Sequence, residues 1–140
     1  MTHDLWILVS LVVLTELLTL PPVAARGSVS GGIKWLLRNR DTALGGVAPW
    51  GDRAARAHGN MAGNLAMYAA VILIAFVTGA ANETTAMAGT VLLAARILYA
   101  AVYIAGMPYL RTAVFAVGQF AMLVYVWQIV AHSLAHSKAR

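Results

Sequence analysis

The sequence contains no cysteine and little charge, and both absences narrow what the protein can be. Without cysteine in 140 residues, a disulfide framework, a thiolate metal site and a cysteine nucleophile are excluded. Only 11% of the residues are charged and 61% are hydrophobic, which is not the composition of a water-soluble globular protein. The four histidines are scattered without the spacing of a metal site, so we expect no bound metal.

Acidic residues are especially scarce, with five Asp and Glu against ten Lys and Arg. The resulting net charge of +5 raises the question of a nucleic-acid partner. However, the bases flank apolar segments and do not form the face of a soluble domain. This placement is typical of membrane proteins, so the expected partner is a lipid bilayer and not nucleic acid.

Long apolar segments are what the sequence has in abundance. Four of them lie at about residues 5–25, 56–77, 85–105 and 110–134. Each has the roughly 20 residues that a helix needs to cross a hydrocarbon core, where the backbone must satisfy its own hydrogen bonds. We therefore expect an all-α integral membrane four-helix bundle that forms one transmembrane domain over residues 1–140. The first segment lacks the basic start of a signal peptide, so we expect a retained helix, loosened by Pro21 and Pro22.

Charge in the loops predicts the orientation. The second loop has no base, whereas the first loop and its edges hold six, namely Arg26, Lys34, Arg38, Arg40, Arg53 and Arg56. The positive-inside rule then places the first loop in the cytoplasm and both termini outside, and we expect a bacterial inner membrane. Within this loop the stretch IKWLLRNR is amphipathic. We expect it to lie along the headgroups with Trp35 and Leu36 inward and its bases toward anionic lipid.

The stretch RAARAHGNMAGNLAMYAAV carries polar and small residues into the second apolar segment. On a helical wheel the polar ones share one sector, namely Arg53, Arg56, Asn60 and Asn64. A neighbouring stripe of small residues lets another helix approach closely, and it includes Ala55, Gly59, Gly63 and Ala66. The asparagines suit an interhelical hydrogen bond, which is common in membranes, or a polar pocket near the cytoplasmic face.

One base lies deep in the bundle. Arg96 is near the middle of the third segment, where a guanidinium costs about 2.5–3.5 kcal/mol on insertion scales, so it must face protein or water. Glu16 is the only acid at a similar depth. Two hypotheses are open: an ion pair between Arg96 and Glu16, within or between subunits, and a contact of Arg96 with a ligand.

Bases, amides and phenols gather at the predicted cytoplasmic end of the helices. They are Arg26, Arg53, Arg56, Asn60, Tyr99, Tyr103 and Arg111. Taken singly, the tyrosines suit an interfacial belt and Arg111 suits a snorkelling anchor. Taken together, they suit a small anionic ligand that enters from the cytoplasm.

Two stretches carry a family resemblance. RAARAHGNMAGNLAMYAAVILIAFVTG resembles the second-helix signature of the MAPEG family, the membrane-associated proteins in eicosanoid and glutathione metabolism, in a degenerate form of a bacterial type. AARILYAAVYIAGMPYLRTAVFAVGQF resembles the family's third helix and the start of its fourth. The resemblance implies a homotrimer that binds glutathione between subunits near the cytoplasmic end, with a lipophilic small molecule arriving from the lipid.

The resemblance also implies roles for individual residues. Arg111 matches the arginine that activates the thiol and is the candidate catalytic residue. Arg56, Asn60 and Tyr103 match glutathione-binding positions, and Arg26 is a weaker match for a first-helix base. Arg53 and Tyr99 adjoin these positions, and we expect them in the same glutathione site.

The sequence departs from the family signature at two charged positions. Family enzymes usually carry an arginine where this chain has Gly59 and a glutamate where it has Gly63. Each lost charge-assisted bond would weaken glutathione binding by about 1.5–3 kcal/mol. Two functions therefore stay open: a glutathione-dependent transferase or peroxidase acting on lipophilic electrophiles, and a non-catalytic membrane protein of the same fold that binds lipid or a small molecule. A transporter is disfavoured because the sequence has no inverted repeat.

Overall fold

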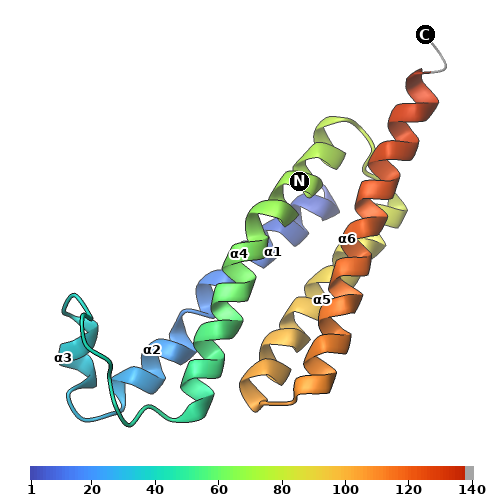
Figure 1. Cartoon of the computed structure of the whole chain (residues 1–140). Helices are drawn as coiled ribbons and strands as arrows, with labels where there is room; N and C mark the ends of the chain where they lie inside the picture. The colour runs from blue at the N-terminus through green and yellow to red at the C-terminus, as the bar shows by residue number, and fades with distance from the viewer. Residues whose placement is uncertain (138–140) are drawn as a thin grey trace.

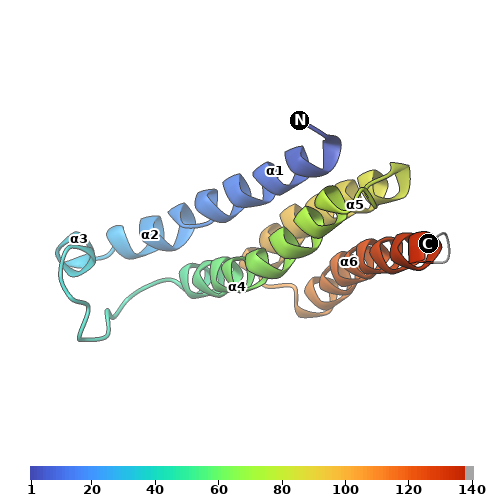
Figure 2. The same cartoon turned by 90° about the horizontal axis from the view of Figure 1, so that it is seen from above.

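The structure, a computed structural model, describes residues 1–137 and arranges them as helices without any strand in that range. The helices are α1 (His3–Leu17), α2 (Leu20–Gly27), α3 (Gly32–Leu36), α4 (Pro49–Val77), α5 (Glu83–Ala105) and α6 (Pro108–Ser137). Four long rods run side by side, one of them made of α1 and α2, while the short α3 lies beyond the bundle at the lower left (Figure 1). From above, α4 and α5 lie between the α1–α2 rod and α6 (Figure 2). The predicted all-α fold is confirmed.

The first rod is interrupted between α1 and α2 by two prolines. Pro21 and Pro22 have no N–H to donate to the carbonyls four residues earlier, so the regular helical ladder cannot pass this point. The chain turns there through a hydrogen bond from the Thr19 amide to the carbonyl of Glu16, at 3.0 Å, and α2 then continues in nearly the same direction (Figure 1). The predicted loosening of this helix is confirmed.

The second rod, α4, begins at Pro49, well before the predicted start at residue 56. Proline is favoured at the first helical position because its missing N–H is not needed there. Asp52 in the first turn adds a favourable charge at the positive end of the helix dipole. Because these turns are polar, the hydropathy pattern did not predict them. They are nevertheless helical, and they hold Arg53 and Arg56 in a fixed register.

The turn between α5 and α6 brings the ends of these two helices together. Gly106 ends α5 with φ of +84°, a left-handed conformation that glycine adopts without strain. The amide of Met107 then donates to the carbonyl of Val102 at 3.1 Å, and Pro108 starts α6. This closed turn places Tyr103, near the end of α5, beside Arg111 in the first turn of α6.

The opposite end of the bundle is closed by a buried polar contact. The Tyr125 hydroxyl on α6 donates to a carboxylate oxygen of Asp4 on α1 at 2.7 Å, and both residues are buried. Gly89 on α5 leaves room for this contact, because a Cβ there would lie 2.6 Å from the Tyr125 hydroxyl oxygen. Three helices are thereby fixed together at this end.

The outward surface of the rods is apolar. Four stretches are long and apolar enough to cross a membrane, namely His3–Gly27, Pro49–Val77, Glu83–Ala105 and Pro108–Ser137. Only 22% to 44% of each apolar window is buried within the chain, and large side chains such as Trp6, Phe120 and Trp127 are exposed. Such a surface is unstable in water but suits hydrocarbon, so the chain is an integral membrane protein.

Candidate functional site

The guanidinium of Arg96 lies inside the bundle and is only 1% exposed. Its Nη2 donates to the side-chain oxygen of Asn60 on α4 at 2.6 Å. The rings of Tyr99, Phe115 and Tyr68 surround it, with centroids 4.7, 5.3 and 5.5 Å from Cζ. These cation–π contacts and the hydrogen bond offset part of the cost of burying the charge. The Nε and Nη1 groups are buried with no hydrogen-bond partner among residues 1–137.

Of the two hypotheses for Arg96, the ion pair with Glu16 is wrong within the described chain. Glu16 is exposed on α1, and the ion pair found among residues 1–137 joins Arg26 to Asp52 at 3.7 Å. The reason is the register of α1: Thr15 takes the inward position on this turn, and the next residue is rotated by about 100°. An amide on α4, not an acid on α1, therefore receives the buried guanidinium.

A hollow opens beside this buried arginine, between α4, α5 and α6. It has a volume of about 280 Å³ and is lined by Asn60, Tyr99, Tyr103, Arg111, Thr112 and Phe115. Asn60 thus contacts Arg96 and also lines the hollow. Because its side-chain oxygen accepts from Arg96, its Nδ2 is the group left to donate to a ligand. The Asn64 side chain bonds within its own helix, since its Nδ2 donates to the Asn60 carbonyl at 2.7 Å.

A second hollow adjoins the first at the end of the bundle. It has a volume of about 180 Å³ and is lined by Arg53, Arg56, Tyr103, Gly106, Met107, Pro108 and Arg111. Tyr103 and Arg111 line both hollows, and the Arg111 guanidinium lies 4.6 Å from the centroid of the Tyr103 ring. The two hollows are therefore parts of one candidate site, which we call the paired hollow.

Arg53 is held in place by the turn after α5. Its Nε donates to the carbonyl of Ile104 at 2.8 Å, and the side chain lies against Gly106, where a Cβ would be 3.1 Å from Nε. The bond ties α4 to the end of α5 and leaves the terminal guanidinium nitrogens for other partners. Glycine at position 106 thus serves both the left-handed turn and the close approach of this arginine.

The paired hollow is positively charged. Three bases line it, Arg53, Arg56 and Arg111, and no carboxylate does so among the described residues 1–137. Phenols and an amide supply further hydrogen-bonding groups. Arginine donates to carboxylates through a planar fork, and a cluster of bases without acids attracts anions. The arrangement is chemically suited to a small anion with several hydrogen-bonding groups.

The structure brings together six of the seven predicted site residues. Within the chain Arg26 lies apart, on the other face of α4: its Nη1 donates to the carbonyl of Pro22 at 3.1 Å and its Nη2 lies near Asp52. Thr112 and Phe115 line the hollow but were not assigned to the site from the sequence. Their positions in the same turn as Arg111 and one turn after it were the available signal.

Two further polar residues lie near Arg96, outside the lining of the paired hollow, and were not assigned to the site from the sequence. Gln119 on α6 donates through Nε2 to the Tyr68 hydroxyl on α4 at 3.3 Å. Since the Tyr68 ring also contacts Arg96, this bond ties α6 to the group of side chains around the buried charge. For Gln119 the sequence did offer a signal, because this residue lies one helical turn after Phe115 on the same face of α6.

These features define an integral membrane helical protein with a basic pocket at one end of its bundle. The sequence model of the MAPEG family matches residues 5–131, nearly the whole chain. The protein belongs to the MAPEG family, and the predicted membership is confirmed. Neither the comparison with curated proteins nor the comparison with solved structures gave a match.

The contact between Arg96 and Asn60 predicts strong energetic coupling. Asn60→Ala leaves the buried guanidinium without its hydrogen bond, so the melting temperature in detergent should fall. In the Arg96→Met background the same change should cost much less, with a coupling energy of about 0.5–3 kcal/mol. Glu16→Gln is the control and should be additive with Arg96→Met. Additivity at Asn60, or coupling at Glu16, would contradict the observed pairing.

Proposed function

We propose that the protein binds glutathione in the paired hollow and transfers its thiol to lipophilic electrophiles, or reduces lipophilic peroxides with it. The proposal rests on one observation: Tyr103 and Arg111 line both hollows, and three arginines in all line the combined site. Glutathione has two carboxylates, a thiol and two amides, which match bases, phenols and an amide donor. Membership of a family named for glutathione metabolism supports the same ligand.

The position of each base suggests its role. Arg53 and Arg56 line the outer hollow, at the end of the bundle, and would hold the carboxylates. Asn60, oriented by Arg96, would donate through Nδ2 to a peptide carbonyl. Tyr99 and Tyr103 stand edge to face, with centroids 5.5 Å apart, and form a stiff wall beside them. These residues bind and orient the ligand without reacting themselves.

Arg111 is the residue we assign to the thiol. Its guanidinium is half-buried and lies over the Tyr103 ring, so it is held where the two hollows meet. A neighbouring cation favours thiolate over thiol, and the thiolate is the reactive form. Glutathione supplies the sulfur, which bonds to an electrophilic carbon as the leaving group departs with its electron pair. The thiol proton passes to water.

A second candidate function rests on what the paired hollow lacks. No carboxylate lines it among residues 1–137, so the ammonium group of glutathione has no acidic partner there. Gly59 and Gly63, at the two signature positions, offer no side chain at all. These observations favour a non-catalytic membrane protein of the same fold that uses the hollow for another anionic small molecule or lipid.

We further propose a homotrimer, with the first loop cytoplasmic and both termini outside in a bacterial inner membrane. Supporting the assembly, a Cβ at Gly59 or Gly63 would meet no other part of the described chain within 4 Å. The small stripe of α4 is therefore open to a helix of a second copy at Gly59, Gly63 and Ala66, while Ala55 lines a hollow with Pro22 and Trp35 of the same chain. The neighbour could then add its Arg26 to the site.

Replacing Arg111 should slow conjugation of glutathione to an aryl halide. A thiol with an ordinary pKa near 8.5 is about 3% thiolate at pH 7, so Arg111→Ala should lower kcat/KM by about ten- to thirtyfold at that pH. The deficit should shrink as pH rises above 9, because the thiol then ionises without help. Arg38→Ala, which removes a base that does not line the paired hollow, is the control. No turnover in the unmodified protein would favour the non-catalytic candidate.

The oligomer is tested by native mass spectrometry in several mild detergents. The unmodified protein should appear as a trimer. Ala66→Leu should shift the population toward monomer, because the larger side chain fills the small stripe, whereas Ala101→Leu on the exposed side of α5 should not. A monomer in every detergent, or equal loss from both variants, would contradict the assigned interface.

Supplying the missing acid should strengthen glutathione binding. In the variant Gly63→Glu the new carboxylate lies one turn after Asn60 on α4, where the chain leaves open space. A partner for the ammonium should raise affinity about tenfold, or 1.4 kcal/mol, while Gly63→Gln, which has the same shape without charge, should not. Because Gly63 lies in the small stripe, the trimeric fraction of each variant is isolated first and then titrated by calorimetry. Equal affinities would show that the hollow does not hold glutathione through its ammonium group.

A further inference from the structure

The short helix α3 packs against α2 and faces α4 across a hollow. Trp35 and Leu36 line a hollow of about 340 Å³ together with Pro22 and Val23 of α2 and His58 of α4. The indole of Trp35 donates to the carbonyl of Thr42 at 2.6 Å, which pins the loop to the helix. Because α3 follows directly after α2, which ends a rod long and apolar enough to cross a membrane, we infer that α3 lies near the level where that rod leaves the hydrocarbon.

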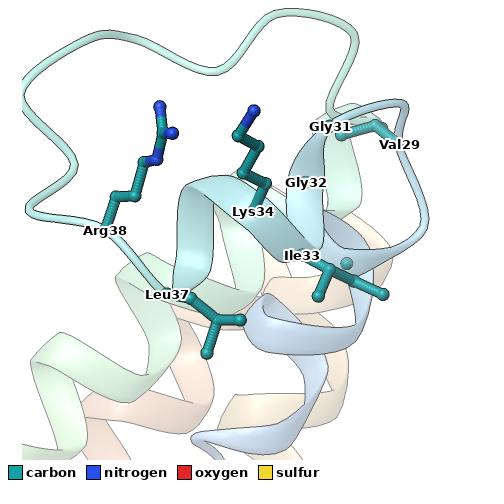
Figure 3. A pocket seen from close by; sticks show the side chains of 8 residues that line it. Val29, Gly31, Gly32, Ile33, Lys34, Leu37 and Arg38 are labelled. Carbon is teal, nitrogen blue, oxygen red and sulfur yellow. The ribbon is translucent and has the colours of Figure 1, made fainter.

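The outward sides of α3 and of the two residues that follow it separate apolar from basic side chains. Ile33 and Leu37, one helical turn apart, are 66% and 84% exposed. Lys34 and Arg38, also one turn apart, are exposed as well. In Figure 3 the two apolar side chains project to one side of α3 and the two basic ones to the other. Water would disfavour the apolar side, whereas a bilayer boundary suits both sides at once.

A hollow of about 560 Å³ lies at this boundary between apolar and basic side chains. It is lined by Gly27, Val29, Gly31, Gly32, Ile33, Lys34, Leu37 and Arg38 (Figure 3). Lys34 and Arg38 also line a neighbouring hollow, of about 360 Å³, between α3 and the loop that includes Arg40 and Asp41. Three bases and one acid line this second hollow, so its side chains carry an excess of positive charge.

We propose that α3 binds an anionic phospholipid, with Lys34 and Arg38 holding its phosphate and Ile33 and Leu37 contacting its acyl chains. Three arguments favour this occupant over a protein partner. The membrane-spanning helices hold α3 at the bilayer boundary, where phospholipid is always present. The bases complement an anionic headgroup. The apolar pair complements acyl chains, and both pairs belong to the same two turns. The site is separate from the paired hollow and does not depend on glutathione.

The test is native mass spectrometry of the delipidated protein titrated with phosphatidylglycerol and, separately, with phosphatidylcholine of the same acyl chains. The unmodified protein should bind phosphatidylglycerol more tightly. The double variant Lys34→Gln/Arg38→Gln should weaken phosphatidylglycerol binding about twenty-five-fold, at about fivefold per base on a membrane surface. It should weaken phosphatidylcholine binding much less, because the choline cation of that lipid offsets the charge of its phosphate. Ile33→Ser/Leu37→Ser should weaken the binding of both lipids.

The control is Lys138→Gln/Arg140→Gln, which removes the same net charge from the other end of the sequence and should leave phosphatidylglycerol binding unchanged. Glycerol phosphate should not compete, because it lacks acyl chains. Equal affinity of the unmodified protein for the two lipids, an equal loss from the control, or competition by glycerol phosphate would each overturn the proposal. A glutathione titration of Lys34→Gln/Arg38→Gln should match that of the unmodified protein, and a parallel loss there would also overturn the assignment of a separate site.

Discussion

The burial of the Arg96 guanidinium between three membrane-spanning helices is the constraint on which the rest of the site depends. A charge at this depth is tolerated only where protein groups replace water around it. Here an amide oxygen from α4 and aromatic rings from α4, α5 and α6 do so. The three helices must therefore pack closely around this residue, and their ends are brought together as a consequence.

Asn60 contributes both to the packing of the bundle and to the lining of the hollow. Its oxygen accepts a hydrogen bond from Nη2 of the buried arginine, which leaves its amide nitrogen as the donor at the hollow. On the other side of the hollow the glycine turn after α5 sets Tyr103 beside Arg111 and receives Arg53. A positively charged pocket thus arises from contacts that also stabilise the bundle. Its residues can be tested for ligand binding only with the stability of each variant measured alongside.

Much of the fold could be predicted because lipid imposes a simple rule. A span of about 20 apolar residues must be helical there, so the number and order of the rods followed from hydropathy alone. The early start of α4 at Pro49 did not, since its first turns lie outside the apolar pattern. Six predicted site residues line the paired hollow because the topology places the ends of their helices together. Arg26 lies apart because the α1–α2 rod borders the opposite face of α4.

The partner of Arg96 shows where the sequence reasoning failed. Opposite charge pointed to Glu16, but the inward register of α1 is set by Leu11 and Thr15 and turns the acid outward. Asn60 was weighed as a helix–helix hydrogen bond and as a pocket residue, and in the structure it lines the hollow and bonds to Arg96. Thr112 and Phe115 were not assigned to the site because uncharged side chains do not stand out among the apolar residues of a membrane helix.

The most direct test of the central claim, that the paired hollow binds glutathione, is a thermal-shift titration of the unmodified protein. Glutathione is compared with its dimethyl ester, in which both carboxylates are blocked. Because a ligand that binds only the folded state raises the melting temperature by mass action, glutathione should give a saturable rise with a Kd of about 1 mM or lower. The ester should give none, because Arg53 and Arg56 then have no carboxylate to hold. No shift with glutathione, or equal shifts with both compounds, would contradict the account.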